Sequence, residues 1–419
     1  MQPRATNDDP TFEHLVAKRD AALAAGDVAT AKDTNERLAH AEIAAGARRY
    51  QHLPVIVHVE LTTRCSCSCI MCSRCYERVA ERDLNVELLE GLLPCARVAV
   101  INGVGEPLLH PRFADVLELL RKYGVVASAT TNLQHLSREH VPLVAEVFGR
   151  VGVSCDGATA RTYESIRRGA SFERLCDNAR LLTSSCPNTR FQLAVVSMRQ
   201  NIRESEAIVE LAARLGFDSV RFGRLETNRL LENEGDSLMC FPDLARECLG
   251  RAGRRGKELG VEVSVPRVLR GPADPICVEK QAQRLLERPL FRPDSFYEAL
   301  PARYAELERA GLFEPRPYEL EPTIDSEGLC HWLGLGTYVS VDGEVRPCGE
   351  IVGAPEPAGD NEYNPLNLPS SCALREVFLG GHVPRACANC SYLMNDELSS
   401  VVLDEARLFR SLVGREEEK

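Results

Sequence analysis

Short apolar runs alternate with amphipathic segments through the first half of the chain. Six runs rich in β-branched residues have the length and composition of buried strands. They are residues 55–61, 97–102, 125–130, 150–155, 191–197 and 219–223. Segments with helical periodicity separate them, and several end near Gly or Ser, as helices often do. This alternation is typical of βαβ units with a parallel sheet, arranged as a curved partial barrel or as an open doubly wound sheet.

The pattern differs on either side of this repeat. The Ala- and Leu-rich residues 11–48 predict two helices that are broken at Gly26. Later, "TYVSVDGEVRPC" predicts a hairpin that turns at Asp342-Gly343. We divide the chain into an N-terminal helical extension, a βα core, a connecting or substrate-contacting segment without clear strand alternation, a cysteine-bearing module, and a C-terminal helix with a charged tail. Their ranges are 1–53, 54–226, 227–329, 330–392 and 393–419.

Composition narrows the class of protein. The formal net charge of −11 over 419 residues argues against a nucleic-acid or anionic-membrane binder. No apolar run reaches the roughly 18 residues that a membrane span needs, and the N-terminus lacks an apolar signal-type core, so we expect a cytoplasmic protein. In that reducing compartment, 17 cysteines favour metal or redox chemistry over disulfides.

The densest cysteine cluster directly follows the first predicted strand. Cys65, Cys69 and Cys72 form a C-x3-C-x2-C pattern. Cubane iron–sulfur clusters are held by cysteine thiolates, and three ligands leave one iron open to a substrate or cofactor. A four-cysteine zinc site that also uses Cys67 or Cys75 is the alternative that spacing alone leaves open.

Polar residues and glycines follow the next three strands. "NGVGEP" (residues 102–107) comes after the second strand, Thr130 to Asn132 after the third, and Ser154 to Asp156 after the fourth. Glycines let the backbone approach a ligand closely, although this short motif could also be a plain turn. Because the carboxyl ends of parallel strands share one edge, a binding site is expected there.

Together, C-x3-C-x2-C, G-x-G-E-P, "TTN" and "SCDG…TYESIRRG" resemble the radical S-adenosylmethionine (SAM) enzymes over roughly residues 54–226. The resemblance implies an α/β fold: a partial (β/α)6 barrel with an N-terminal helical segment and a small C-terminal α+β iron–sulfur module. It implies that Cys65, Cys69 and Cys72 hold a [4Fe-4S] cluster whose open iron binds SAM, which disfavours zinc. Reduction, by an external donor such as flavodoxin or ferredoxin, would give a 5′-deoxyadenosyl radical that takes a hydrogen atom from the substrate.

The resemblance also suggests SAM-binding positions. They are Met71, Gly103, Gly105, Glu106, Pro107, Thr131, Asn132, Ser154 and Arg167. The glycine-containing segment would receive the methionyl amine, Ser154 the ribose or carboxylate, and Arg167 or Arg168 the carboxylate; a solvated helix-surface charge is the alternative for Arg167. Met71 stands where the family commonly has an aromatic residue against adenine, so a thioether would replace ring stacking.

A second group of cysteines lies near the C-terminus. Cys330, Cys348, Cys387 and Cys390 would close a four-ligand shell around zinc or an iron–sulfur cluster. Their pattern resembles the auxiliary-cluster modules called SPASM and twitch, which implies one auxiliary [4Fe-4S] cluster, with Cys372 as a fifth candidate ligand. A fully ligated cluster suits electron transfer, and hence a net two-electron oxidation of the substrate.

The substrate is the least constrained part. A helical N-terminal extension differs from the winged-helix recognition domain of many peptide maturases, which favours a small polar substrate. We expect dehydrogenation of a secondary alcohol of an aminocyclitol or sugar in antibiotic-type natural-product biosynthesis. The alternatives are a peptide maturase (crosslinking, epimerisation or sulfatase-type maturation) and a non-enzymatic iron–sulfur electron carrier. Candidate bases or hydrogen donors, each also explicable as a structural or solvated residue, are His110, His135, Arg199, Arg224, Glu226, Cys155 and Cys240.

Overall fold

The computed structural model describes residues 10–227, 230–265, 289–310, 322–325, 330–349, 356–357 and 364–387. Within them, one sheet of ten strands has the order β11-β10-β9-β1-β2-β3-β4-β5-β6-β7. Its strands are β1 (Ile56–Val59), β2 (Val98–Ile101), β3 (Val126–Thr131), β4 (Phe148–Ser154), β5 (Arg190–Ser197), β6 (Ser219–Arg224), β7 (Glu262–Ser264), β9 (Gly336–Val339), β10 (Glu344–Arg346) and β11 (Glu356–Pro357). All neighbours from β9 through β1 to β7 are parallel, and β10 and β11 are antiparallel.

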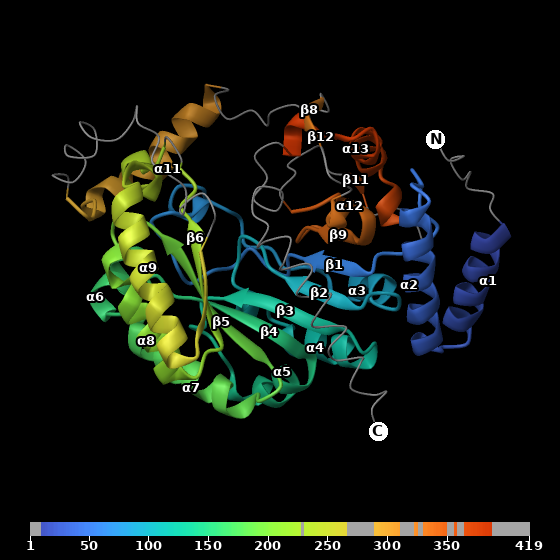
Figure 1. Cartoon of the computed structure of the whole chain (residues 1–419), viewed down its shortest axis with the longest axis horizontal. Coiled ribbons are helices and arrows are strands. Elements are labelled where there is room, and N and C mark those ends of the chain that lie inside the picture. The colour runs from blue at the N-terminus through green and yellow to red at the C-terminus, as the bar shows by residue number, and fades with distance from the viewer. Residues whose placement is uncertain are drawn as a thin grey trace.

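The six predicted strands are all present within a few residues of their predicted bounds, and the curved sheet confirms the partial barrel (Figure 1). Helices lie along its outer side: α3 (Leu89–Leu92), α4 (Phe113–Lys122), α5 (Val141–Val147), α6 (Ala160–Ile166), α7 (Phe172–Ser185), α8 (Ser205–Leu215) and α9 (Pro242–Leu259). In α4 the buried residues Phe113, Val116, Leu117 and Leu120 follow helical spacing and join the main core. Gly216 ends α8 with φ 78°, a left-handed conformation that suits glycine.

The repeat continues further than the sequence pattern indicated. We expected residues 227–329 to lack strand alternation, but α9 and β7 add another helix and parallel strand at the edge of β6. A strand of three residues is too short to show a period-two pattern, which explains why it was missed. In the same segment, α11 (Asp294–Arg309) packs against the turn at 73–75 that follows Cys72.

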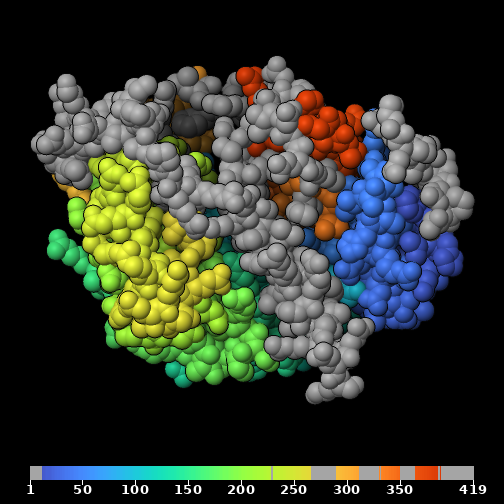
Figure 2. Space-filling view, viewed as in Figure 1, coloured from blue at the N-terminus to red at the C-terminus, as the bar shows by residue number. Residues whose placement is uncertain are grey.

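The N-terminal extension is a helical hairpin, as predicted. Its helices are α1 (Pro10–Ala24) and α2 (Val28–Ala44), with Gly26 at φ 73° between them. The hairpin packs on the barrel because Lys32 donates to the carbonyls of Tyr123 and Gly124 at 2.5 and 3.1 Å. Figure 2 shows α1 and α2 on one side of the molecule and α9 on the opposite side.

The cysteine-bearing module is continuous with the barrel sheet. It contains α12 (His331–Leu335), β9, β10, α13 (Pro369–Leu379) and β12 (His382–Pro384), which pairs with β8 (Pro322–Asp325). β9 and β10 form the predicted hairpin, with Gly343 at φ 78°. β9 also pairs with β1 along its whole length, from Ile56 with Gly336 to Val59 with Val339.

Two sequence-based expectations are not addressed by these elements. The predicted C-terminal helix after residue 392 and Cys390 lie outside the described residues. No helix in the described part of the chain has the length and apolarity needed to cross a membrane.

Candidate functional site

The loop after β1 carries the first cysteine group. Ser68 and Ile70 donate their backbone N–H groups to the carbonyls of Arg168 and Ile166, at 2.8 and 3.0 Å, so the end of α6 fixes the middle of the loop. Gly169, with φ 90°, permits this contact, because a Cβ there would lie 2.7 Å from the Ser66 carbonyl oxygen. The loop therefore has a defined position at the carboxyl end of the barrel.

The thiols of this loop interact with one another. A hydrogen bond with the Cys67 thiol lowers the pKa of Cys65 to about 6 and also lowers the pKa of Cys69. Burial raises the pKa of Cys72. Both downward shifts act toward the thiolate, the form that binds metal, so the chemistry of this cysteine set suits an iron–sulfur cluster. No three His, Cys, Asp or Glu side chains of the described ranges are grouped closely enough to hold a metal ion.

The G-x-G-E-P segment packs against the chain that leads into the cysteine loop. A Cβ on Gly105 would lie 2.0 Å from the Thr62 carbonyl oxygen, and one on Gly103 would lie 2.5 Å from Cγ of Glu60. The Glu106 N–H donates to the Arg64 carbonyl at 2.7 Å. We expected these glycines to let the backbone approach a ligand closely. The structure shows that both let it approach the segment that leads into the cysteine loop.

Glu106 is buried and joins this segment to the end of β3. Its carboxylate accepts from the Thr131 hydroxyl at 2.5 Å and from the Asn132 N–H at 2.6 Å, with a longer bond from the Leu108 N–H at 3.3 Å. Burial raises the pKa of Glu106 to about 7, while these three donors act in the opposite direction. Thr131 and Asn132 are thereby brought to the cysteine loop.

Asn132 and Arg167 contact the cysteine sulfurs directly. The Asn132 side-chain amide lies 3.7 Å from Sγ of Cys65 and 3.5 Å from Sγ of Cys67. Arg167 Nη1 lies 3.7 Å from Sγ of Cys69, and its Nε forms a 2.8 Å ion pair with the fully buried Asp156. Arg167 is therefore not a solvated surface charge, which was the alternative for it.

The remaining SAM-binding candidates lie in the cysteine loop or at the ends of neighbouring strands. Ser154 is the buried last residue of β4, and Pro107 is buried at the start of a short 3-10 turn. Met71 packs against the apolar cluster of Ile70, Ile166, Met198 and Leu225. These side chains thus come from the cysteine loop and from the ends of the strands.

Several candidate bases are engaged elsewhere. His110 contacts the Leu84 carbonyl and the Arg112 N–H through its two ring nitrogens, at 3.1 Å each. Arg199 pairs with Asp236 and donates to the Pro289 carbonyl. His135, Arg224 and Glu226 are exposed, and Cys240 donates to the Glu234 carbonyl.

Cys155 is also held within the protein. Its thiol donates to the Gly157 carbonyl at 3.3 Å, and burial raises its pKa to about 12. A thiol with this pKa stays protonated at neutral pH. Its surroundings match the structural role given as the alternative for it.

Three of the four C-terminal cysteines of the predicted set pack on the same apolar cluster. Cys330, Cys348 and Cys387 share one apolar cluster with Trp332, and this cluster includes Ile56 of β1 and Val98 of β2. Cys372 lies apart from that cluster, because its sulfur contacts the Asn367 carbonyl and the Arg375 guanidinium, at 3.7 and 3.4 Å. Cys330, Cys348 and Cys387 therefore share surroundings that Cys372 does not share.

Three residues that we did not single out from the sequence, His58 of β1, Glu60 just after it and Tyr338 of β9, link β1 to the C-terminal module and to the "NGVGEP" segment. The His58 ring lies 4.8 Å from the Tyr338 ring and 5.7 Å from the Trp332 ring. The Glu60 carboxylate accepts from the Val104 N–H at 2.8 Å and from the Tyr338 hydroxyl at 3.3 Å. Polar residues at alternate positions of the apolar strand "VHVEL" are the signal that could have identified them.

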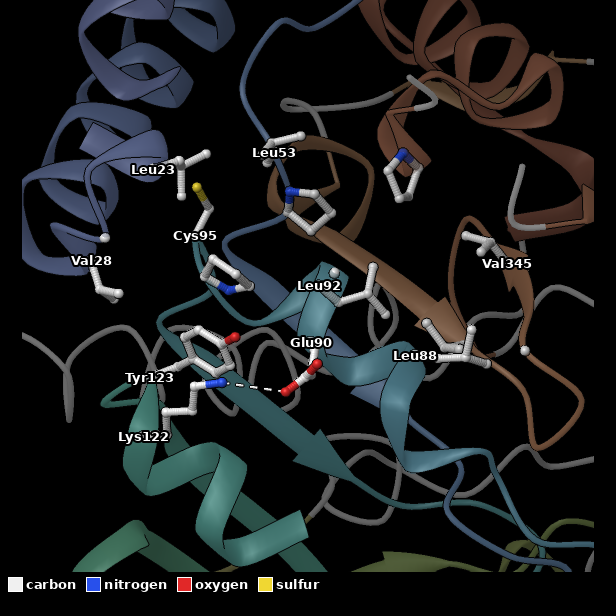
Figure 3. A pocket seen from close by; sticks show the side chains of 17 residues that line it. Leu23, Val28, Leu53, Leu88, Glu90, Leu92, Cys95, Lys122, Tyr123 and Val345 are labelled. Carbon is white, nitrogen blue, oxygen red and sulfur yellow. Dashed lines mark hydrogen bonds and ion pairs between the residues drawn. The ribbon is translucent and has the colours of Figure 1, made fainter. Parts of the chain in front are cut away.

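A large cavity lies elsewhere, away from both cysteine groups. It has a volume of about 770 Å³ and lies between the N-terminal hairpin, α3 and the β9–β10 hairpin (Figure 3). Leu23, Leu53 and Leu92 line it, and an ion pair of Lys122 with Glu90 lies at its edge. Of the predicted cluster cysteines, none of the six that the structure describes lines it.

Comparisons with known proteins agree with this geometry. Residues 59–212 match the family model described as the Radical SAM superfamily. The mycofactocin maturase MftC of Mycolicibacterium smegmatis is 27% identical over 171 residues, which is 39% of this chain and 43% of that protein. The GTP 3′,8-cyclase of Lactiplantibacillus plantarum is 29% identical over 140 residues, which is 30% of this chain and 41% of that protein. The chain thus spans less than half the length of these curated relatives.

One solved structure shows the same fold over most of the chain. Streptococcus suis SuiB, in its complex with the precursor peptide SuiA, superposes with a TM-score of 0.51 at 12% identity, covering 80% of this chain and 68% of that one. The similarity is one of fold alone. Residues 59–212 of this chain thus match the radical SAM domain in sequence, and the SuiB comparison shows the same fold around them.

Proposed function

We propose that this radical SAM enzyme oxidises a peptide substrate by two electrons. Enzymes of this superfamily use a [4Fe-4S] cluster and SAM, which together supply a 5′-deoxyadenosyl radical when bound. The observation that carries the proposal is the contact of Asn132 with Cys65 and of Arg167 with Cys69, in the loop that also carries Cys72. We assign the three cysteines as the ligands of that cluster.

The chain's own residues would orient the cofactor and exclude water. Glu106 fixes the strand ends around the cysteine loop, and the buried pair of Asp156 and Arg167 places a guanidinium beside Cys69. A guanidinium fork suits a carboxylate, so the free edge of Arg167 remains our candidate for the SAM carboxylate, with Ser154 beside it at the end of β4. The apolar group around Met71 would cover the adenine.

We assign Cys330, Cys348, Cys387 and Cys390 to an auxiliary [4Fe-4S] cluster that would supply an electron acceptor. The grouping of the first three around Trp332 supports this assignment. In a two-electron oxidation the substrate loses one hydrogen atom to the radical and then a proton and an electron. Burial of the cysteine group against β1 and β2 would keep the acceptor on the barrel side of the module.

The relatives favour a peptide over the aminocyclitol or sugar that the sequence favoured. MftC is named a maturase, and the SuiB structure holds a precursor peptide. The helical hairpin that argued against peptide recognition is present, but it packs on the outer side of the barrel, away from the cysteine loop. It therefore gives no direct information on what the site accepts.

The first experiment tests the cluster ligands. The anaerobically reconstituted protein should hold about eight iron atoms per chain if two [4Fe-4S] clusters are present. Cys348→Ala should lower this to about four and keep SAM cleavage by dithionite. Cys372→Ala is the matched control from the same module and should retain the full iron content. Equal losses in both variants would contradict the ligand assignment.

The second experiment tests the substrate class. Short peptides encoded beside the gene and a panel of aminocyclitols would each be incubated with the enzyme, SAM and dithionite. A peptide that loses two hydrogen atoms by mass spectrometry, with one 5′-deoxyadenosine formed per product, supports the proposal. Oxidation of an aminocyclitol and of no peptide would contradict the peptide proposal and support the substrate class that the sequence favoured. Absence of 5′-deoxyadenosine with every substrate would contradict radical SAM activity.

A further inference from the structure

We propose that Asn132 is a positioning residue for the cluster rather than a contact for SAM: its side-chain amide donates hydrogen bonds to the sulfurs of Cys65 and Cys67 and raises the reduction potential of the SAM-binding cluster. The inference rests on the proposed function, because it takes Cys65 as a cluster ligand. It differs from the sequence-based expectation, which placed Asn132 among the SAM-binding residues.

The amide orientation is fixed by its other end. Oδ1 of Asn132 accepts the backbone N–H of Gln134 at 3.0 Å. A backbone N–H can only donate, so the oxygen must face it and the NH2 group must face the cysteines. The distances of 3.7 Å to Cys65 and 3.5 Å to Cys67 suit N–H···S hydrogen bonds, which are longer than those to oxygen. Asn132 is only 5% exposed, so water has little access to compete for its N–H donors.

The backbone on both sides of Asn132 is also fixed. Its N–H donates to Glu106 at 2.6 Å, and its carbonyl accepts from the Gln134 side chain at 3.3 Å. Leu133 follows with φ 57°, a conformation that is unfavourable for a residue with a Cβ. It is maintained because the Leu133 N–H donates to the Thr131 hydroxyl and its carbonyl accepts from Asn178, at 2.9 and 2.8 Å. Strained turns of this kind are found at functional sites when the surroundings over-determine them.

The chemical effect follows from the charge on sulfur. Reduction of an iron–sulfur cluster adds negative charge that is shared with its cysteine sulfurs, and hydrogen bonds to those sulfurs are one of the factors that set the potential. A donor at Cys65 stabilises the reduced state more than the oxidised state. Arg167 acts in the same direction at Cys69, so two of the three ligands have a donor from the protein.

Cys67 gains a role from the same geometry. Its thiol interacts with both Cys65 and Cys69, and it receives the second N–H of Asn132. Asn132 thus aligns a non-ligand thiol between two ligands, which would hold the loop in its ligand-ready form. This gives a role to the buried Cys67, which we expected from the sequence to be an ordinary small side chain.

The test is a redox titration of the reconstituted holoenzyme, monitored by the electron paramagnetic resonance signal of the reduced cluster. Asn132→Leu removes the donors, and Asn132→Asp replaces them with an acceptor of the same shape. Both should lower the midpoint potential, Asp more than Leu, while the dissociation constant for SAM changes less than twofold. Asn178→Ala is the matched control, because it loosens the same turn without touching a sulfur, and it should leave the potential unchanged.

The outcomes separate this inference from the proposed function. If the wild-type protein binds no [4Fe-4S] cluster at Cys65, both fail. If the wild type binds it and cleaves SAM but neither Asn132 variant shifts the potential, only this inference fails. SAM binding weakened tenfold or more at an unchanged potential would overturn it in favour of a direct contact between Asn132 and SAM. An equal shift in Asn178→Ala would also overturn it, since the turn rather than the amide would then set the potential.

Discussion

The buried pair of Asp156 and Arg167 gives the most direct test of how the site is held together. Asp156 is fully buried at the end of β4, and Arg167 is nearly so at the end of α6. Two unit charges about 4 Å apart attract by about 4 kcal/mol at an effective dielectric constant of 20. Removing one partner leaves the other charge buried, which typically costs about 3–5 kcal/mol. We therefore expect Asp156→Asn to destabilise the protein by about 3 kcal/mol or more.

Arg167→Met should behave differently with pH. Burial raises the pKa of Asp156, and the Arg167 charge opposes that rise. Without Arg167 the pKa of Asp156 rises further, so the carboxyl takes up a proton in the folded protein and avoids part of the penalty at low pH. The folded state then binds a proton that the unfolded state has released, so stability falls as pH rises. The destabilisation by Arg167→Met should be smaller at pH 5 than at pH 8.

The assay is urea denaturation of the metal-free, reduced protein, using the midpoint at constant slope. Asp156→Asn, Arg167→Met and the double variant form a double-mutant cycle. The double variant should cost clearly less than the sum of the singles, because neither charge remains. Costs below about 1 kcal/mol for each single variant, or strict additivity, would refute the reasoning that this pair is a buried, mutually compensating ion pair.

Three further predictions concern the frame of the site. Gly105→Ala adds a Cβ that would lie 2.0 Å from the Thr62 carbonyl oxygen, so it should lower the free energy of unfolding by about 2 kcal/mol or more and reduce cluster incorporation. Gly91→Ala is the control, because a Cβ there meets open space, and it should be nearly neutral by urea denaturation. Burial raises the pKa of Glu106 to about 7, so the folded wild type keeps a proton that the unfolded chain releases, and its stability should fall relative to that of Glu106→Gln by up to about 3 kcal/mol as pH rises from 4.5 to 7. The same pH dependence of stability in the wild type and in Glu106→Gln would contradict that pKa. Arg375→Met should cost about 3 kcal/mol or more, because the fully buried guanidinium bonds three backbone carbonyls, while the exposed Arg48→Met should cost less than about 1 kcal/mol by the same measurement.

The strands were predictable because their signal is local. A run such as residues 191–197 carries its β-branched and apolar residues in one stretch, and β5 spans Arg190–Ser197. The turn at Gly343 was predictable for the same reason. The pairing of β9 with β1 was not, because it joins segments that lie far apart in the chain, and neither segment names its partner.

The same difference between local and long-range signals decides which parts of the candidate site could be predicted. Cysteine spacing indicated which residues gather after β1, since a loop of that length keeps them near one another. The contact of Arg167 with Cys69, and the direction of the Asn132 amide, depend on a helix end and on a turn with φ 57° at Leu133. A leucine gives no sequence signal for a left-handed conformation, so the turn that aims Asn132 could not be foreseen.

β1 determines how the two cysteine groups lie relative to each other. Its alternate residues Val57 and Val59 belong to the main barrel core, while Ile56 belongs to the cluster that contains Cys348. At its end, Glu60 holds the segment before Glu106 with one oxygen and Tyr338 with the other. This short strand and the residue after it therefore contact the main core, the apolar cluster that contains Cys348 and the segment before Glu106. Moving the cysteine-bearing module away would require breaking the β1–β9 ladder and exposing Ile56, so the proposed electron acceptor is held at a fixed position by the same strand that leads into the first cysteine loop.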